Sequence, residues 1–157
     1  AAKHPDWSLV ILGEGPERAN LQTFAADLGI ADRVSLAGQC QEPDVILKGA
    51  DLFVLPSRTE GFPNALLEAM ACQLPVVSAD CSSGGPRDII HDGIDGVLVP
   101  PDDVAALAGA MDRLMADSDE RRRLGRGALN VIERFSMEKI MTMWDKAVTH
   151  TCRAVNQ

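Results

Sequence analysis

Short runs of apolar residues alternate along most of the chain with segments whose apolar residues recur at helical spacing. The apolar runs predict strands at residues 7–12, 34–38, 52–55, 75–78 and 96–99. The helical spacing predicts helices at residues 17–28, 43–48, 64–72, 102–115, 119–133 and 136–151. Because strands that alternate with helices form βαβ units, the pattern predicts an α/β fold. We expect a doubly wound parallel sheet with helices on both faces and further helices at the C-terminal end.

The composition fits one domain with an aliphatic core. The chain has 157 residues, of which 46% are hydrophobic and 4% aromatic, and 15 Lys and Arg against 23 Asp and Glu give a net charge of −8. This balance argues against a nucleic-acid partner. The tight basic cluster is Arg121 to Arg123 with Arg126. It is interpreted as a solvated helix face paired with Asp117, Asp119 and Glu120.

The cysteines and the apolar runs favour a cytoplasmic protein. Cys40, Cys72, Cys81 and Cys152 form no C-x-x-C pair, which is typical of reduced thiols. No apolar run approaches the roughly 18 residues of a membrane span, and no signal peptide is visible. The chain opens with Ala1 rather than Met, just before a strand, and this suggests a piece of a longer polypeptide.

A glycine-rich turn follows the predicted first strand. Its sequence, Gly13-Glu14-Gly15-Pro16, resembles the start of a dinucleotide fingerprint. The third glycine of that fingerprint is absent and Pro16 stands within it, so neither NAD nor FAD is expected as a cofactor. Such a turn can still admit a phosphate to its backbone N–H groups, and a purely structural βα turn is an equal alternative.

The loop after the predicted third strand carries two carboxylates. Glu60 lies at the end of that strand, and Glu68 lies on the helix that begins near Asn64. Pro63 suits the first turn of that helix, whose free N–H groups and partial positive charge attract a phosphate. A carboxylate beside them can accept hydrogen bonds from sugar hydroxyls. The alternative is that Glu60 caps the helix and that Glu68 meets solvent or an arginine.

The motifs in and after this loop carry a resemblance. Residues 60–72, followed by 74–77 and 92–100, are similar to the signature of family 4 nucleotide-sugar glycosyltransferases, which are retaining enzymes with the GT-B fold. The similarity runs from the turn at residues 13–16 to a last helix that opens at residues 135–140. The resemblance implies that the whole chain, 1–157, is the C-terminal, donor-binding, Rossmann-like domain of a two-domain enzyme.

The resemblance also implies roles for residues of the two loops. Glu60 is the expected catalytic-site carboxylate that binds the donor sugar, and Glu68 is expected to hold the ribose. The donor sugar and diphosphate would be lined by Gly13, Gly15, Gly61, Phe62, Pro63 and Asn64. The nucleobase would meet the loop of Gly38, Gln39 and Cys40.

Family members generally work without a metal, so neither a cofactor nor a metal is expected. His4, His91 and His150 lie far apart in sequence and are interpreted as surface residues. The family's diphosphate-binding Arg and Lys come from a region before the first strand here. Arg58 and Arg87 lie in suitable loops, but a surface role is the favoured interpretation for both.

These features predict the donor-binding half of a retaining transferase. The donor would be a UDP-sugar, and the transferred group would be a hexose or an N-acetylhexosamine added to a bacterial-type polysaccharide or glycoconjugate. A glycan or lipid-linked acceptor would bind the N-terminal domain, and this chain by itself is expected to be inactive. Peripheral attachment of the parent enzyme to the inner face of a membrane is compatible with this interpretation. The alternatives are an epimerase or phosphorylase on the GT-B fold, and a catalytically silent nucleotide-binding scaffold.

Overall fold

The structure, a computed structural model, describes the backbone of residues 3–155 and the side chains of residues 3–149. The strands are β1 (Leu9–Leu12), β2 (Val34–Gly38), β3 (Phe53–Leu55), β4 (Val76–Ala79) and β5 (Val97–Val99). The helices are α1 (Arg18–Asp27), the 3-10 turn η1 (Ala31–Arg33), α2 (Pro43–Lys48), α3 (Asn64–Ala71), α4 (Gly85–Ile89), α5 (Val104–Ala116), α6 (Ser118–Ala128), α7 (Asn130–Arg134) and α8 (Met137–Val155). The predicted alternation of strands and helices is confirmed.

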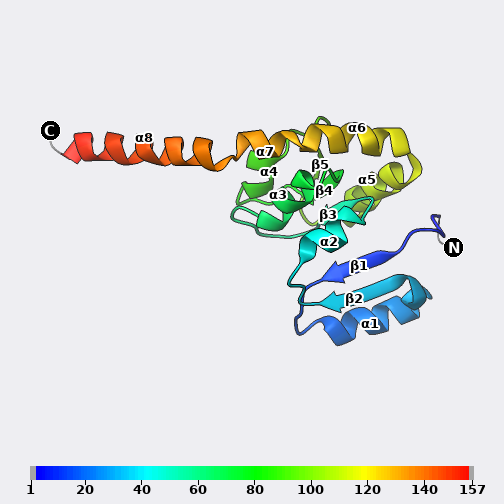
Figure 1. Cartoon of the computed structure of the whole chain (residues 1–157). Coiled ribbons are helices and arrows are strands. Elements are labelled where there is room, and N and C mark those ends of the chain that lie inside the picture. The colour runs from blue at the N-terminus through cyan, green and yellow to red at the C-terminus, as the bar shows by residue number, and fades with distance from the viewer. Residues whose placement is uncertain (1–2, 156–157) are drawn as a thin grey trace.

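All paired strands are parallel, but they form two sheets instead of one. β1 pairs with β2 in register Leu9 to Val34, and the second sheet has the order β3-β4-β5. β1 and β3 are both edge strands because each is hydrogen-bonded on one side only. Figure 1 shows the resulting division, with β1, α1 and β2 below α2 and the remaining elements.

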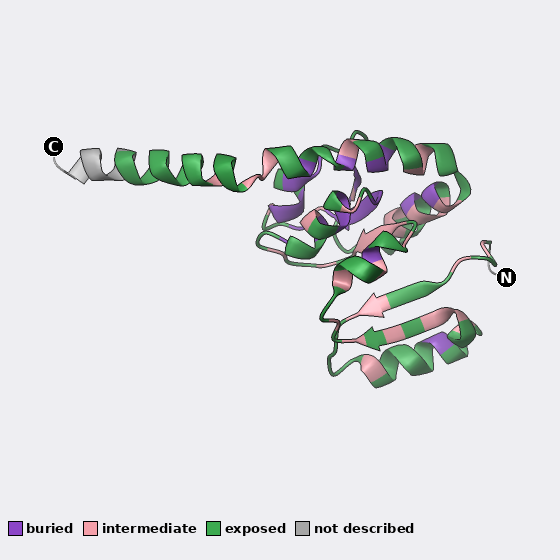
Figure 2. Cartoon of the chain, viewed as in Figure 1, coloured by how far each residue is buried: buried purple, intermediate pink, exposed green. Residues whose placement is uncertain are grey.

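The central strand of the three-stranded sheet is buried on both faces. Val76 and Val77 of β4 are each 0% exposed and point to opposite faces of the sheet. One face packs on a cluster that includes Leu66 and Ile89, and the other on a cluster that includes Leu114. Each such aliphatic side chain stabilises the fold by about 1.5–3 kcal/mol when it leaves water. The purple segments of Figure 2 gather around this sheet, so it forms the core of the molecule.

The two-stranded sheet is covered far less. Leu9, Val10 and Phe24 are 45%, 46% and 62% exposed, and Ala25 is the buried residue of α1. Burial on both faces was expected for the whole sheet; it holds along all of β4 and for part of β5, whereas β3 is half-buried and β1 and β2 are half-buried or exposed. The first sheet consequently contributes little apolar burial to the fold.

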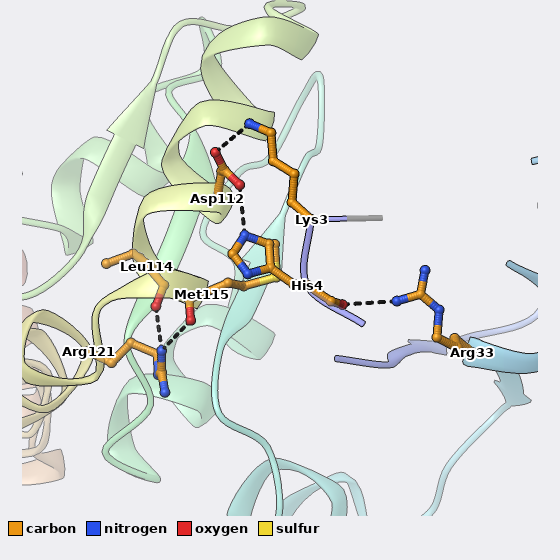
Figure 3. A network of polar contacts seen from close by, with 7 residues as sticks. All are labelled: Lys3, His4, Arg33, Asp112, Leu114, Met115 and Arg121. Carbon is orange, nitrogen blue, oxygen red and sulfur yellow. Dashed lines mark hydrogen bonds and ion pairs between the residues drawn. The ribbon is translucent and has the colours of Figure 1, made fainter. Parts of the chain in front are cut away.

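Polar contacts of the N-terminal segment tie the first sheet to α5 (Figure 3). The Asp112 carboxylate accepts hydrogen bonds from Lys3 Nζ at 2.8 Å and from His4 Nε2 at 2.7 Å. These two donors, Lys3 first, hold the pKa of Asp112 below its ordinary value. Arg33 of η1 donates to the His4 carbonyl at 3.0 Å. His4 is therefore a part-buried bonding residue, which corrects its interpretation as a surface histidine.

Arg121 of α6 adds a second link between α5 and the segment that precedes β1. Its guanidinium donates to the carbonyls of Leu114 and Met115 at 2.6 and 3.0 Å, at the C-terminal end of α5 (Figure 3). The same group lies 5.0 Å from the ring centroid of Trp7, within cation–π distance. The neighbouring arginines of the basic cluster do pair with acids, Arg122 with Asp119 and Arg123 with Glu120.

The C-terminal helices differ from the predicted ones in two ways. The single helix expected over residues 119–133 is two helices, α6 and α7, which meet at Leu129. α8 extends away from the rest of the chain in Figure 1 and leaves its apolar side chains exposed, Trp144 and Met143 at 64% each. Within residues 3–155, no helix combines the length and the hydropathy that crossing a membrane requires.

Two helical glycines provide a matched test of this packing. A Cβ at Gly125 of α6 would lie 2.4 Å from the Gln73 carbonyl oxygen, whereas a Cβ at Gly109 of α5 would have open space around it. We expect Gly125→Ala to lower the free energy of unfolding by about 1–3 kcal/mol through overpacking. Gly109→Ala should raise it by about 0.5–1 kcal/mol through helix propensity. Urea unfolding measures both changes, and equal effects of the two variants would contradict the observed packing of α6.

Candidate functional site

The segment between β3 and α3 holds the two predicted carboxylates. β3 ends at Leu55, and α3 begins at Asn64 with Pro63 at its N-cap, so Pro63 precedes the first helical turn instead of opening it. No side chain caps this helix, which contradicts the alternative that Glu60 is the cap. The amides of Leu66 and Leu67 both donate to the Pro63 carbonyl. The amides before them, at the start of α3, are available to an outside acceptor.

Glu60 precedes this helix start along the chain, and Glu68 follows it. Glu60 is half-buried in the loop, and Glu68 is exposed on the second turn of α3, roughly 6 Å along the axis from Asn64. Neither carboxylate forms an ion pair with any residue that the structure describes. Two unpaired carboxylates beside free N–H groups are suited to a ligand that carries both hydroxyls and an anionic group.

The loop residues between them differ in accessibility. Gly61, Phe62 and Asn64 are exposed, and a Cβ added at Gly61 would meet nothing within 4 Å. Pro63 is buried. The ring of Phe62 packs edge-on against that of Phe135, with 5.4 Å between the ring centroids. The backbone of Gly61 and Asn64 is therefore open to a ligand, while Pro63 and Phe62 anchor the loop.

The second predicted group lies at the ends of β1 and β2. The Gly13 amide donates to the Gly38 carbonyl at 2.8 Å, and both glycines have positive φ, 123° and 73°. L-residues adopt such angles at a cost, so the turn requires glycine there. Arg18 fastens the turn by donating to Glu14 at 2.9 Å and to the Leu36 carbonyl at 2.8 Å.

This arrangement joins the residues predicted for the phosphate and the nucleobase into one surface. Gly15 has open space around its Cα, Gln39 is exposed, and Cys40 is a half-buried free thiol. Among the described residues, no hydrogen bond or ion pair joins this surface to the loop of Glu60.

The two candidate arginines are paired elsewhere. Arg58 donates to Asp102 at 2.8 Å, and its side chain is 85% exposed. The Arg87 guanidinium donates to the Asp80 carboxylate through Nε and Nη2, and these hydrogen bonds raise the pKa of the guanidinium. A surface role for both agrees with the sequence interpretation.

A cavity of about 590 Å³ lies near the ends of β4 and β5. It is lined by Asp80, Ser82, Arg87, Asp92, Leu98, Val99, Pro100 and Pro101. None of these belongs to the predicted donor-binding residues. Among residues 3–149, no group of three His, Cys, Asp or Glu side chains is arranged as metal ligands would be.

Sequence reasoning missed a polar cluster behind the loop. Asp95, 2% exposed, accepts hydrogen bonds from the His91 amide at 2.6 Å, from His91 Nδ1 at 2.9 Å and from Arg134 at 3.2 Å. The Arg134 guanidinium lies 5.2 Å from the Phe135 ring centroid, and Phe135 in turn contacts Phe62. His91 is exposed, as the sequence analysis expected of a surface histidine, and it also bonds a buried carboxylate. Its spacing of four from Asp95 was the available signal. His150 and Cys152 have side chains outside the described residues.

Comparison with known proteins decides the family. The sequence model of the family described as "Glycosyl transferases group 1" matches residues 1–131. The chain belongs to this family of group 1 glycosyltransferases. Its parallel strands and flanking helices make it an α/β, Rossmann-like half of a GT-B fold.

Two curated relatives show how much of a longer protein this group 1 glycosyltransferase chain matches. It is 41% identical over 147 residues to an exopolysaccharide phosphotransferase of Streptomyces coelicolor, covering 93% of this chain and 16% of the relative. It is 38% identical over 140 residues to the lipopolysaccharide core biosynthesis glycosyltransferase LpsE of Rhizobium meliloti, covering 88% of this chain and 41% of the relative. The chain spans less than half the length of either relative.

A solved structure resembles the group 1 glycosyltransferase chain in three dimensions. It is a mutant form of the TarM protein of S. aureus in complex with fondaparinux, alpha-GlcNAc-glycerol and UDP. The TM-score is 0.81 at 28% sequence identity, and the match covers 88% of this chain and 28% of that chain.

The cluster behind the loop predicts an unequal effect of two ion-pair substitutions. Asp95→Asn removes the buried negative charge that Arg134 and His91 face and one of its two acceptor oxygens, and we expect the free energy of unfolding to fall by about 2–3 kcal/mol. Glu133→Gln breaks the exposed pair with Lys139 and should change it by less than about 0.5 kcal/mol. Urea unfolding of both variants tests this, and an Asp95→Asn protein as stable as the wild type would show that the cluster does not hold the loop region.

Proposed function

We propose that this chain is the donor-binding domain of a retaining glycosyltransferase and that it binds a nucleotide sugar, with UDP as the nucleotide. The observation that carries the proposal is the pair of unpaired carboxylates, Glu60 and Glu68, which precede and follow the open start of α3 along the chain. In this account the start of α3 receives the diphosphate, and the two carboxylates receive the hydroxyls of the two sugars.

Glu68 is proposed to bind the ribose. Its carboxylate is exposed, stands on a regular helix and can accept two hydrogen bonds from neighbouring hydroxyls. Glu60 is proposed to bind the transferred sugar from the half-buried loop, where its carboxylate is shielded more from water. Gly61, Phe62, Pro63 and Asn64 would line the sugar and the diphosphate between them.

The joined ends of β1 and β2 are proposed to complete the site. Gly13 and Gly15 present backbone to a phosphate without side chains in the way. Gly38, Gln39 and Cys40 would meet the nucleobase. TarM, a relative in fold at 28% identity, was solved with UDP, which supports this choice of nucleotide.

The wider role is proposed from the relatives. The names of two of them refer to exopolysaccharide and to lipopolysaccharide core biosynthesis, which supports transfer of a hexosyl or N-acetylhexosaminyl group in glycan assembly. We propose a metal-free reaction in which basic side chains and N–H groups stabilise the leaving diphosphate. The acceptor, a glycan or lipid-linked oligosaccharide, would bind another domain. The longer enzyme would attach to the inner face of a membrane peripherally, if it acts there.

The ribose role predicts that UDP binding weakens when the Glu68 carboxylate is removed and not when another exposed glutamate is removed. We expect calorimetric titration to show that Glu68→Ala weakens UDP binding about tenfold, a loss of about 1.4 kcal/mol, because both ribose hydrogen bonds disappear. Glu138→Ala, which removes another exposed helical glutamate, should leave UDP binding unchanged. Titration with GDP tests the choice of base.

A wild-type chain that binds neither UDP nor GDP at millimolar concentration would contradict the nucleotide-binding role. Equal losses in Glu68→Ala and Glu138→Ala would contradict the ribose role alone. Binding of UDP without transfer by the longer enzyme would favour the silent scaffold, and release of an epimerised or phosphorylated sugar would favour the other GT-B activities.

Substitution of Glu60 should affect the rate of sugar transfer, whereas substitution of Glu68 should affect UDP affinity. In the longer enzyme that carries this domain, Glu60→Gln removes the carboxylate charge and should reduce the rate of sugar transfer at least about a hundredfold, while UDP affinity changes less than twofold. Assays of product formation and of UDP binding on the same variant measure the two quantities. A Glu60→Gln enzyme with normal turnover would contradict the assignment.

A further inference from the structure

The backbone of Glu60 is held by a side chain from a distant part of the sequence. Ser83 Oγ accepts a hydrogen bond from the Glu60 amide at 3.1 Å and donates one to the Glu60 carbonyl. One hydroxyl therefore satisfies both backbone groups of the same residue, which a serine or threonine side chain can do and alanine cannot. Both bonds fix the direction in which the Glu60 side chain leaves the loop.

The residues after Ser83 press against the next position of the loop. A Cβ at Gly85 would lie 2.0 Å from the carbonyl oxygen of Gly61, so only glycine permits this close approach. Gly84 has a φ of 86°, in the left-handed region, which turns the chain toward the loop. Gly85 is buried in this contact. The turn of Ser83, Gly84 and Gly85 thus forms a rigid backing for Glu60 and Gly61.

The loop is also held on another side. Phe62 contacts Phe135, whose neighbour Arg134 bonds the buried Asp95. These contacts leave the Glu60 carboxylate free of described ion pairs while fixing the backbone that carries it. A site of this kind is preorganised, because its backbone does not need to be ordered again when a ligand binds.

We infer that Ser83 is a positioning residue for the donor sugar: its hydroxyl holds the Glu60 backbone so that the carboxylate meets the sugar and not the nucleotide. The inference rests on the proposed function, in which Glu60 binds the transferred sugar and Glu68 the ribose. The inference assigns Ser83 to the sugar half of the donor and not to the nucleotide half. Ser83 Oγ bonds the Glu60 backbone and contacts Cys81 Sγ, and no hydrogen bond among the described residues joins it to α3.

Three variants of neighbouring serines test this assignment in the chain as it stands. Ser83→Ala removes both hydrogen bonds to Glu60 and the 3.5 Å contact with Cys81 Sγ, and Ser83→Thr keeps the hydroxyl. Ser82→Ala is the matched control, since Ser82 is also exposed and its hydroxyl has no partner among the described residues. Each protein is titrated with UDP and with UDP-N-acetylglucosamine and UDP-glucose, and the exchange rate of the Glu60 amide hydrogen is measured by NMR without ligand.

We expect Ser83→Ala to raise the dissociation constant of a UDP-sugar that the wild type binds by about fivefold, with UDP changed less than twofold. Ser83→Thr and Ser82→Ala should behave as the wild type. Equal weakening of UDP and UDP-sugar in Ser83→Ala would overturn the inference in favour of a general structural role. The same would follow if Ser82→Ala gave the same loss, or if Ser83→Ala gave none.

Hydrogen exchange separates this inference from the proposed function. Ser83→Ala should speed exchange of the Glu60 amide at least about tenfold, since that amide loses its acceptor. Suppose that the wild type bound no nucleotide but Ser83→Ala still sped exchange of the Glu60 amide hydrogen. The proposed function and the role of Ser83 toward the sugar would then both fail, while the hydrogen bonding of the Glu60 backbone by Ser83 would be confirmed. Unchanged exchange would overturn the hold on Glu60 itself.

Discussion

Burial of β4, the central strand of the parallel sheet β3-β4-β5, on both faces is the constraint on which the rest of the structure depends. β4 is buried along its whole length, and the clusters around Val76 and Val77 pack helices against its two faces. β3 and β5 are fixed by their pairing with this strand. The loops that leave their C-terminal ends therefore start from rigid positions, and the Glu60 loop is one of them.

The donor site proposed here divides between a rigid and a loosely covered part of the molecule. The loop of Glu60 is backed by Gly85, pinned by Ser83 and packed through Phe62. The turn at Gly13 and Gly38 belongs to the two-stranded sheet, whose strands and helix leave large apolar side chains exposed. Order at the sugar end of the site is thus built into this chain, whereas the nucleobase end has less apolar burial to stabilise it.

Local patterns predicted the elements well because periodicity is a local property. The apolar runs and the helical spacing placed every strand and α3 within one or two residues of their bounds. The division into two sheets was not predictable in the same way, since pairing depends on which edges meet in space. Leu129, where α6 and α7 meet, is a good helix former, so the pattern there predicted one continuous helix.

The site shows the same limit. Glu60 and Glu68 were predictable from their place around a helix start, and their roles remain predictions. Ser83 was not predictable, because its partner lies 23 residues away in sequence and its Ser- and Gly-rich loop is typical of a flexible segment. Asp95 lies in the segment 92–100 that carries the family resemblance, yet its burial against Arg134 depends on a contact between residues 39 positions apart in sequence. Long-range hydrogen bonds of this kind carry no periodic signal.

The most direct test of the central claim is amide chemical-shift mapping by NMR during titration of the chain with UDP. A donor site at the start of α3 predicts that the largest shifts fall at residues 60–68 and at the joined turns of residues 13–15 and 38–40. Shifts confined to the cavity around Asp80, Arg87 and Asp92, or no shifts at all, would contradict a donor site at the start of α3.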